Sequence, residues 1–189
     1  MRGFLVAALV GCLGLGAAGC ADAGPGEPKP APPAATWDGR SLARHVDAAA
    51  GFAFDAPAAG YRLATERFPR TTPPHKIKDI VTLSGPRGVA VTVDVWHNAE
   101  GLALAPWFER HLGFMRAPEA LVGPGTAARA RLPAILVAQP RSDQAAGRDA
   151  TVFASGARVF RVTCHDRDDP RSRAVYERLL ETFTAEAVR

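Results

Sequence analysis

The sequence predicts an α+β fold in which an antiparallel β-sheet is flanked by helices. Two hairpins predict the sheet, because strand-like stretches are broken by turn residues at 85–88 and at 155–156. Two segments with helical spacing, residues 102–115 and 170–183, stand apart from each other in the chain. Strands paired by hairpins and helices separated in this way are typical of an α+β sandwich.

Four strands open the domain, and two of them form the first hairpin. Residues 51–57, GFAFDAP, alternate two phenylalanines with small or polar residues and stop at a proline, which predicts a short strand. Residues 61–68 predict a second strand. Residues 77–85 and 89–96 flank the turn GPRG, and VAVTVDVW places its valines, Val89 included, on one face. This pair predicts an antiparallel hairpin.

A helix is predicted over residues 102–115, where the apolar pattern changes from strand spacing to helical spacing. Pro106 suits the first turn of that helix. The apolar residues with helical spacing are Leu104, Phe108, Leu112 and Met115. Residues 132–139, LPAILVAQ, then form an apolar run of strand length.

The domain ends in the second hairpin and a final helix. Residues 150–164 form the hairpin and turn at Ser155-Gly156. Asp169 and Pro170 are the residue types that begin a helix at its N-cap and first position. The apolar stripe that the final helix should bury consists of Tyr176, Leu179, Leu180 and Phe183.

Four stretches give the chain a resemblance to PsbP-like and Mog1-like domains. They are GFAFDAPAAGYRL, the turn GPRG, the helix with Trp107-Phe108, and RVFRVTC followed by a helix ending YERLLETF. Tyr61 departs from the pattern, since many members have Trp there. The resemblance covers residues 51–183 and implies an antiparallel sheet flanked by helices. It also implies a small accessory or adaptor protein that binds larger partners, and it brings no catalytic residues with it.

The N-terminal residues 1–19 predict a secretory signal peptide. A charged start at Arg2 is followed by a short apolar run and a small-residue exit. The run is slightly shorter than the roughly 20 residues that cross a bilayer. An uncleaved anchor helix is the alternative, and it is disfavoured by Gly11, Gly14, Gly16 and Gly19.

The stretch AAGC at residues 17–20 resembles the lipobox of bacterial lipoproteins. In that family a lipid is attached to the cysteine sulfur and the chain is cut just before it, so the resemblance implies lipidation at Cys20. LVGC at residues 9–12 fits the letters better but leaves too little apolar sequence ahead of the cut. Ordinary cleavage after the A-x-A sequence at residues 21–23 is a second alternative.

Residues 20–36, rich in Pro and Ala, predict a semi-rigid tether, and residues 37–189 a single α+β domain. In polyproline II geometry the tether reaches at most roughly 50 Å. Ala21 follows the cysteine, and for a lipoprotein of two-membrane bacteria this favours the outer membrane. We therefore expect a lipid-anchored protein of the bacterial cell envelope that faces the periplasm.

The charge argues against a nucleic-acid binder, and the cysteines argue against an intrachain disulfide. The net charge is +4, from 23 basic and 19 acidic residues, and the basic residues are interspersed. Nucleic-acid binders concentrate basic residues on one face, so no nucleic-acid partner is expected. Of three cysteines, Cys12 falls in the signal peptide and Cys20 takes the lipid, so Cys164 has no intrachain disulfide partner.

The triplet Cys164-His165-Asp166 contains the residue types of a nucleophile, a base and an orienting carboxylate. Strand alternation instead directs Cys164 to the same face as Phe160 and Val162, where a buried thiol is inert. We therefore expect no catalytic residue there.

Asp94, His97 and Glu100 have the ligand types of a divalent metal site, which His111 or His75 would have to complete. The favoured interpretation is a polar turn that ends the strand. No glycine-rich stretch has the spacing of a phosphate loop, so no cofactor is predicted.

The leading hypothesis is a non-catalytic envelope lipoprotein that presents one binding or adaptor domain on a tether. Its partners would be the membrane, through the N-terminal lipid, and another envelope or secreted protein. One alternative is an envelope hydrolase that uses Cys164 or a His–acid pair. The other is a metal-binding module around His97.

Overall fold

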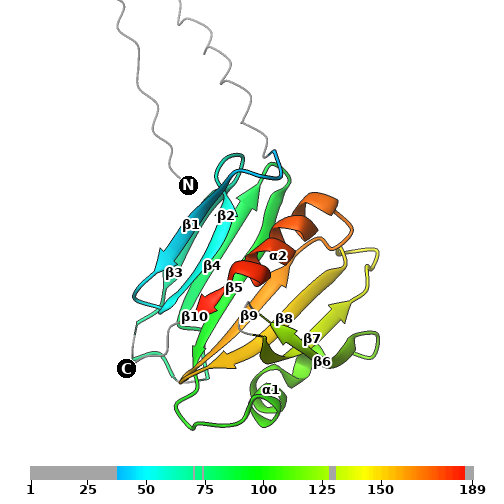
Figure 1. Ribbon diagram of the computed structural model, residues 1–189. Coiled ribbons are helices and arrows are strands. Elements are labelled where there is room, and N and C mark those ends of the chain that lie inside the picture. Colours follow the sequence, from blue (N-terminus) through cyan, green and yellow to red (C-terminus); the bar gives the residue numbers. More distant parts are fainter. Residues whose placement is uncertain (1–37, 70, 74, 128–130, 186–189) are drawn as a thin grey trace, which may run out of the picture. The chain divides into compact units, whose positions relative to one another are not determined.

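The structure is a computed structural model that describes residues 38–69, 71–73, 75–127 and 131–185 (Figure 1). All of them belong to the unit Ala34–Arg189. The predicted signal peptide, Cys20 and the tether lie outside the described residues, as does Trp37.

Seven antiparallel strands form the main sheet, in the order β3-β4-β5-β9-β8-β7-β6. Their bounds are β3 Arg62–Arg67, β4 Asp79–Gly85, β5 Gly88–His97, β6 Leu121–Ala127, β7 Leu132–Gln139, β8 Arg148–Ser155 and β9 Arg158–Cys164. A smaller antiparallel sheet has the order β1-β2-β10. Its strands are β1 Leu42–Asp47, β2 Phe52–Pro57 and β10 Thr184–Ala185.

The described residues also form two short α-helices, α1 Leu104–Leu112 and α2 Pro170–Thr182. A 3₁₀ turn, Gly113–Met115, extends α1. Both predicted hairpins, both helices and the strand at 132–139 are confirmed. The fold is therefore mostly antiparallel β-sheet with two helices, as expected for the α+β class.

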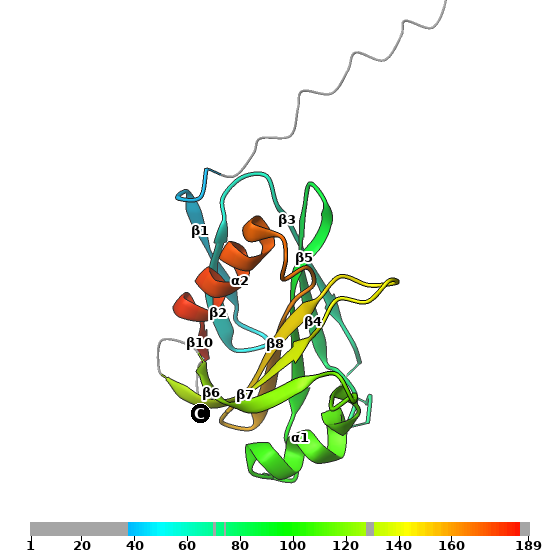
Figure 2. The ribbon, with the colours of Figure 1, turned by 90° about the vertical axis from the view of Figure 1, so that its right-hand side faces the viewer.

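Alternation along the main sheet produces two separate cores, one on each face. On one face, Val93, Phe160 and the other residues that point the same way pack against β2 and α2. Aromatic rings fill this core: the centroids of Phe52 and Phe183 lie 5.5 Å apart, and those of Phe160 and Phe183 lie 5.2 Å apart. Figure 2 shows α2 and β2 together beside the main sheet.

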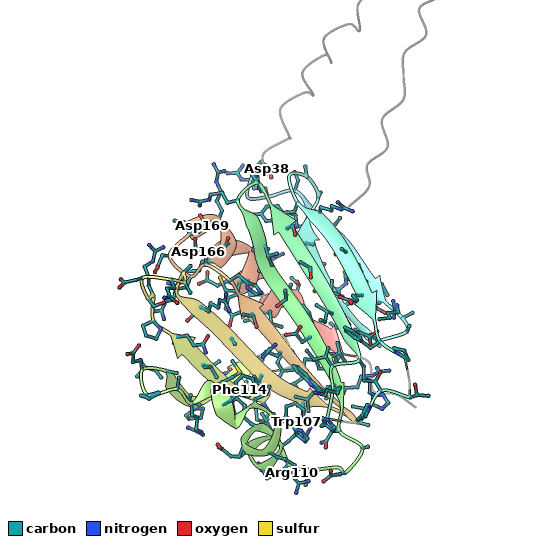
Figure 3. All side chains as sticks on the ribbon, turned by 180° about the vertical axis from the view of Figure 1, so that it is seen from behind. Asp38, Trp107, Arg110, Phe114, Asp166 and Asp169 are labelled. Carbon is teal, nitrogen blue, oxygen red and sulfur yellow. The ribbon has the colours of Figure 1, made fainter. Side chains whose placement is uncertain are left out.

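On the other face, α1 covers Trp96, which meets Trp107 with ring centroids 5.6 Å apart. Trp107 is buried, whereas Arg110 lies exposed on the outer side of the same helix (Figure 3). The amphipathic spacing seen in the sequence thus corresponds to a helix with one buried side.

The sequence-based prediction was wrong about Val89. Its side chain is 44% exposed, because the pairing register of β4 and β5 shifts between Leu83 and Ser84 beside the turn. Ala90 is buried instead.

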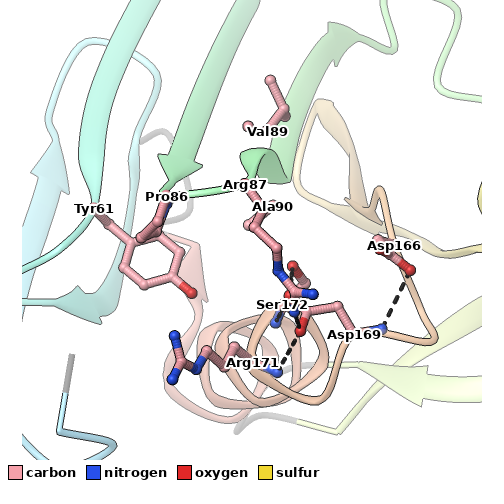
Figure 4. A pocket seen from close by; sticks show the side chains of 11 residues that line it. Tyr61, Pro86, Arg87, Val89, Ala90, Asp166, Asp169, Arg171 and Ser172 are labelled. Carbon is pink, nitrogen blue, oxygen red and sulfur yellow. Dashed lines mark hydrogen bonds and ion pairs between the residues drawn. The ribbon is translucent and has the colours of Figure 1, made fainter. Parts of the chain in front are cut away.

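Asp169 begins α2 as expected. Its carboxylate accepts hydrogen bonds from the backbone N–H groups of Arg171 and Ser172, and it forms an ion pair with Arg87 (Figure 4). The cavity beside this cap has a volume of about 40 Å³, which is too small for an organic ligand. The polar groups there therefore serve to fix the start of the helix.

The predicted stripe of α2 is correct except at Leu180. Tyr176 and Leu179 are buried, and so is Phe183 just after the helix. Leu180 is only partly buried, because α2 lies along one margin of an open part of the sheet and Leu180 faces that margin.

Candidate binding groove

An open apolar groove lies on the main sheet beside α2. It has a volume of about 560 Å³ and runs over strands β6, β7 and β8, with α2 as its wall. We call it the α2 groove. Its main side chains are those of Leu121, Leu136, Ala138, Thr151, Tyr176 and Leu180.

The groove exists because several positions on this part of the sheet carry small side chains. The register pairs Leu121 with Ala138 and Gly123 with Leu136, so bulky and small residues face each other across β6 and β7. Leu136 lies so close to Gly125 that a Cβ there would come 2.5 Å from its Cγ. The leucine side chain therefore lies over Gly125 and forms a low apolar floor.

Two leucines of the groove face solvent. Leu121 is 77% exposed and Leu136 is 41% exposed. Single exposed leucines are normal on protein surfaces, but apolar residues gathered in one concave place mark interaction sites. The groove is therefore the strongest candidate for a binding surface in the described residues.

Tyr176 and Thr151 form the polar part of the wall. The Tyr176 hydroxyl lies 2.6 Å from Thr151 Oγ1, so the hydrogen bond holds α2 against β8. Asp149 lies at one end of the groove, where its carboxylate is 3.3 Å from Arg167 Nη1. These three polar side chains of the groove are thus paired within the protein, and most of the other lining residues are apolar.

The free edge of the sheet beside the groove is poorly suited to adding another strand. β6 is an edge strand, and its sequence LVGPGTA contains Pro124 between two glycines. Proline has no N–H to donate to a sheet ladder, and glycine weakens a strand. A partner should therefore bind the face of the sheet through side chains and not extend the sheet through its backbone.

The structure places Cys164 in the core with Phe160 and Val162, as alternation predicted. Its side chain is fully buried, and burial raises the pKa of the thiol to about 11. His165 points away from it and lies 3.0 Å, by its Nε2, from Thr92 Oγ1. The triplet therefore lacks the exposed, easily ionised thiol that a nucleophile requires.

The residues of the metal hypothesis are not brought together. Asp94 is buried with its Oδ2 2.7 Å from Arg161 Nη2, and Glu100 pairs with Arg110. His97 is exposed at the end of β5. Nowhere in the part of the chain that the structure describes do three His, Cys, Asp or Glu side chains gather as a metal site.

Sequence reasoning missed the groove. The only hint was the combination of a glycine- and proline-rich stretch at 121–127 with an apolar run at 132–139.

Among the described residues, no helix has the length and apolar character needed to cross a membrane.

No protein-family model matches the chain, and no curated protein matches it. Among solved structures, the solution structure of cyanobacterial PsbP (CyanoP) from Synechocystis sp. PCC 6803 is similar to it. The similarity covers 77% of this chain and 93% of that chain, at 12% sequence identity and a TM-score of 0.44.

Proposed function

We propose that the chain is a non-catalytic envelope lipoprotein whose domain binds an amphipathic helix of another envelope or secreted protein in the α2 groove. The lipid on Cys20 and the tether of residues 20–36 would hold the domain near the membrane. The observation that carries the proposal is the uncovered apolar face beside α2, where Leu121 and Leu136 face solvent.

The width of the groove favours a helix as the occupant. Neighbouring strands lie about 4.8 Å apart, so the three strands β6 to β8 present a face about 10 Å wide. An α-helix with its side chains is about 10–12 Å wide. One helix of the partner would therefore fit beside α2 and bury its apolar side on the sheet, as α2 itself does.

The state of Cys164 supports a role without catalysis. The thiol is buried and its pKa is raised, so it is poorly suited to act as a nucleophile. A binding module needs neither an activated nucleophile nor a metal ion, and its affinity would come from the apolar area that the helix covers.

Crosslinking inside intact cells tests the proposal. A photo-reactive residue would replace Leu121 in the groove or, as a matched control, Phe114, which is 74% exposed on the α1 side of the sheet. We expect the Leu121 probe alone to capture a specific protein, with the crosslink on one helix of that protein. Capture of a second copy of this chain, or of lipid alone, would contradict the proposal.

Binding of that helix as a synthetic peptide supplies the quantitative test. Leu121→Asp should weaken the affinity at least tenfold, because it places a charge on the apolar floor, whereas Phe114→Asp should leave it unchanged. Both side chains are largely exposed, so both variants should melt like the wild type. Equal affinities of the two variants would rule out the groove as the docking site.

A further inference from the structure

A second pocket lies at the other end of the domain, between the β1–β2 turn and the ends of the main-sheet strands. We call it the inter-sheet pocket. Its volume is about 450 Å³. It is lined by Ala49, Ala50, Arg67, Phe68, Lys78, Asp79, Val95, His97, Ala157 and Arg158. It shares no lining residue with the α2 groove.

The pocket continues the inner face of the main sheet beyond the aromatic core. Arg67 pairs with Asp79 across β3 and β4, and Asp79 pairs with Val95 across β4 and β5. One step further along the same face, His97 of β5 stands opposite Arg158 of β9. At this end of the strands the inner face of the main sheet thus changes from apolar to charged, and the charged side chains line one pocket.

Most of the charged groups in the pocket already have partners. Nη2 of Arg67 donates to both carboxylate oxygens of the buried Asp47, each at 3.0 Å, and its Nη1 lies 3.5 Å from Asp79. The ammonium group of Lys78 donates to the backbone carbonyls of Thr72 and Pro73.

Arg158 is the exception. Among the described residues, its guanidinium makes one hydrogen bond, a long one from Nη2 to the carbonyl of Ala49 at 3.4 Å. Nη1 is buried without an acceptor, and no carboxylate in the described residues forms an ion pair with this guanidinium. A guanidinium removed from water normally has an acidic or hydrogen-bonding partner, because an unpaired buried charge is costly.

Gly51 leaves space for the guanidinium. A Cβ at position 51 would come 1.9 Å from Arg158 Nη1, and the backbone there has a φ of 64°, which favours glycine. The β1–β2 turn therefore leaves room for Arg158 at the pocket wall.

We infer that the inter-sheet pocket binds a small ligand that carries an anionic oxygen group on an apolar body. The anionic group would face Arg158, with Lys78 and His97 nearby, and the apolar body would lie against Val95 and Phe68. The local balance of charge agrees with this ligand: Arg67, Lys78 and Arg158 contribute three positive charges, against two negative charges from Asp47 and Asp79.

Among the described residues that line the pocket, Asp79 is the one acidic side chain, and it would repel an anion. It lies beside Arg67, and burial raises the pKa of its carboxyl. The guanidinium of Arg67 offsets the charge of the ionised carboxylate, so the repulsion does not exclude the ligand.

Three probes with the same apolar body test the inference on the purified, ¹⁵N-labelled full chain at constant ionic strength: butyrate, butyl phosphate and butylammonium. Amide shifts of Gly51 and His97 report on occupancy. We expect saturable shifts with one or both anions and none with butylammonium. The stronger anion tells whether the natural group is a carboxylate or a phosphate. Saturable shifts with butylammonium would overturn the inference, and so would the absence of saturable shifts with all three probes.

Variants locate the interaction. Arg158→Gln should weaken anion binding at least tenfold, and Arg158→Lys, which keeps the charge, should recover part of it. Arg110→Gln, which removes an exposed arginine on α1, is the matched control and should bind like the wild type. If Arg158→Gln fails to fold, Lys78→Gln tests the same pocket. Unchanged affinity in these pocket variants would show that the anion binds elsewhere.

Discussion

The hydroxyl of Tyr176 on α2 lies 2.6 Å from Oγ1 of Thr151 on β8, and both side chains are buried. Burial raises the pKa of Tyr176 to about 12, so this hydroxyl stays protonated at any physiological pH. The hydrogen bond crosses from helix to sheet at the wall of the α2 groove, and it therefore couples the shape of the groove to the stability of the core.

The first prediction concerns this pair. Tyr176→Phe should lower the free energy of unfolding by about 1–3 kcal/mol, because it leaves the buried Thr151 hydroxyl without its partner. The double variant Tyr176→Phe with Thr151→Val should regain part of that loss, since neither polar group then remains. Urea unfolding measures both. Additive losses in the double variant would contradict the coupling.

Two neighbouring leucines of α2 should behave differently. Leu179 is fully buried, so Leu179→Ala should cost about 2–5 kcal/mol. Leu180 lies at the margin of the groove, so Leu180→Ala should cost clearly less and should weaken binding of the partner helix. Denaturant unfolding compares the two. Equal losses of stability would mean that α2 packs on the sheet through a different side.

Cys164 should react as a buried thiol. In a chain with Cys12 and Cys20 replaced by Ala, a thiol reagent should label Cys164 slowly in the native protein and rapidly in denaturant, because burial shields it and raises its pKa. Rapid labelling of the native protein near neutral pH would contradict this.

Substitutions at Cys164 extend that test. Cys164→Asp should cost about 3 kcal/mol or more, since it buries an unpaired charge, whereas Cys164→Ala should cost only about 1 kcal/mol. Cys164→Ala should also leave binding of the partner helix unchanged. Loss of an enzymatic activity in this stable variant would instead favour a hydrolase.

Acidification should destabilise the fold through histidine. Burial lowers the pKa of His165 from its ordinary value of 6.5, and the nearby Arg148 and Arg161 lower it further. The unfolded chain therefore takes up this proton at a higher pH than the folded chain, and stability falls as the pH drops below about 6.5.

His165→Gln should flatten that dependence between pH 7.5 and pH 5.5. One histidine contributes at most one proton, which corresponds to about 1.4 kcal/mol per pH unit. Unfolding curves at several pH values measure the slope. Parallel curves for the variant and the wild type would show that His165 does not contribute.

Lipidation at Cys20 is the prediction on which the proposed location depends. Cys20→Ser should abolish incorporation of labelled fatty acid and release the protein from membrane fractions, while Cys12→Ser should change neither. Lipid labelling of the Cys20→Ser variant would contradict the anchor.

Local patterns were enough to predict most of the main sheet. The strict alternation in residues 89–96 and the turn at 155–156 depend on near neighbours in the chain, so they indicated strands and hairpins directly. The same holds for Asp169, whose carboxylate contacts backbone groups only two and three residues away. The alternation of residues 89–96 nevertheless gave a wrong side for Val89. The reason is the register shift between β4 and β5, which depends on the partner strand.

Three strands and the groove could not be predicted in this way. β1 reads LARHVD and β6 reads LVGPGTA, and neither has a regular apolar alternation, so only their partners β2 and β7 define them as strands. β10 has two residues. The α2 groove is a place that no other element covers, and such an absence depends on the whole arrangement and has no local pattern.

Pro124 in the edge strand β6 also matters for crowding. If lipid anchors confine many copies of this protein to one membrane surface, their domains meet far more often than they would in free solution. A regular open sheet edge would then allow copies to stack strand on strand into insoluble fibres. The proline and its two neighbouring glycines interrupt that edge. Arg62, Glu66 and Arg67 give the opposite edge, β3, charged side chains that oppose the same association.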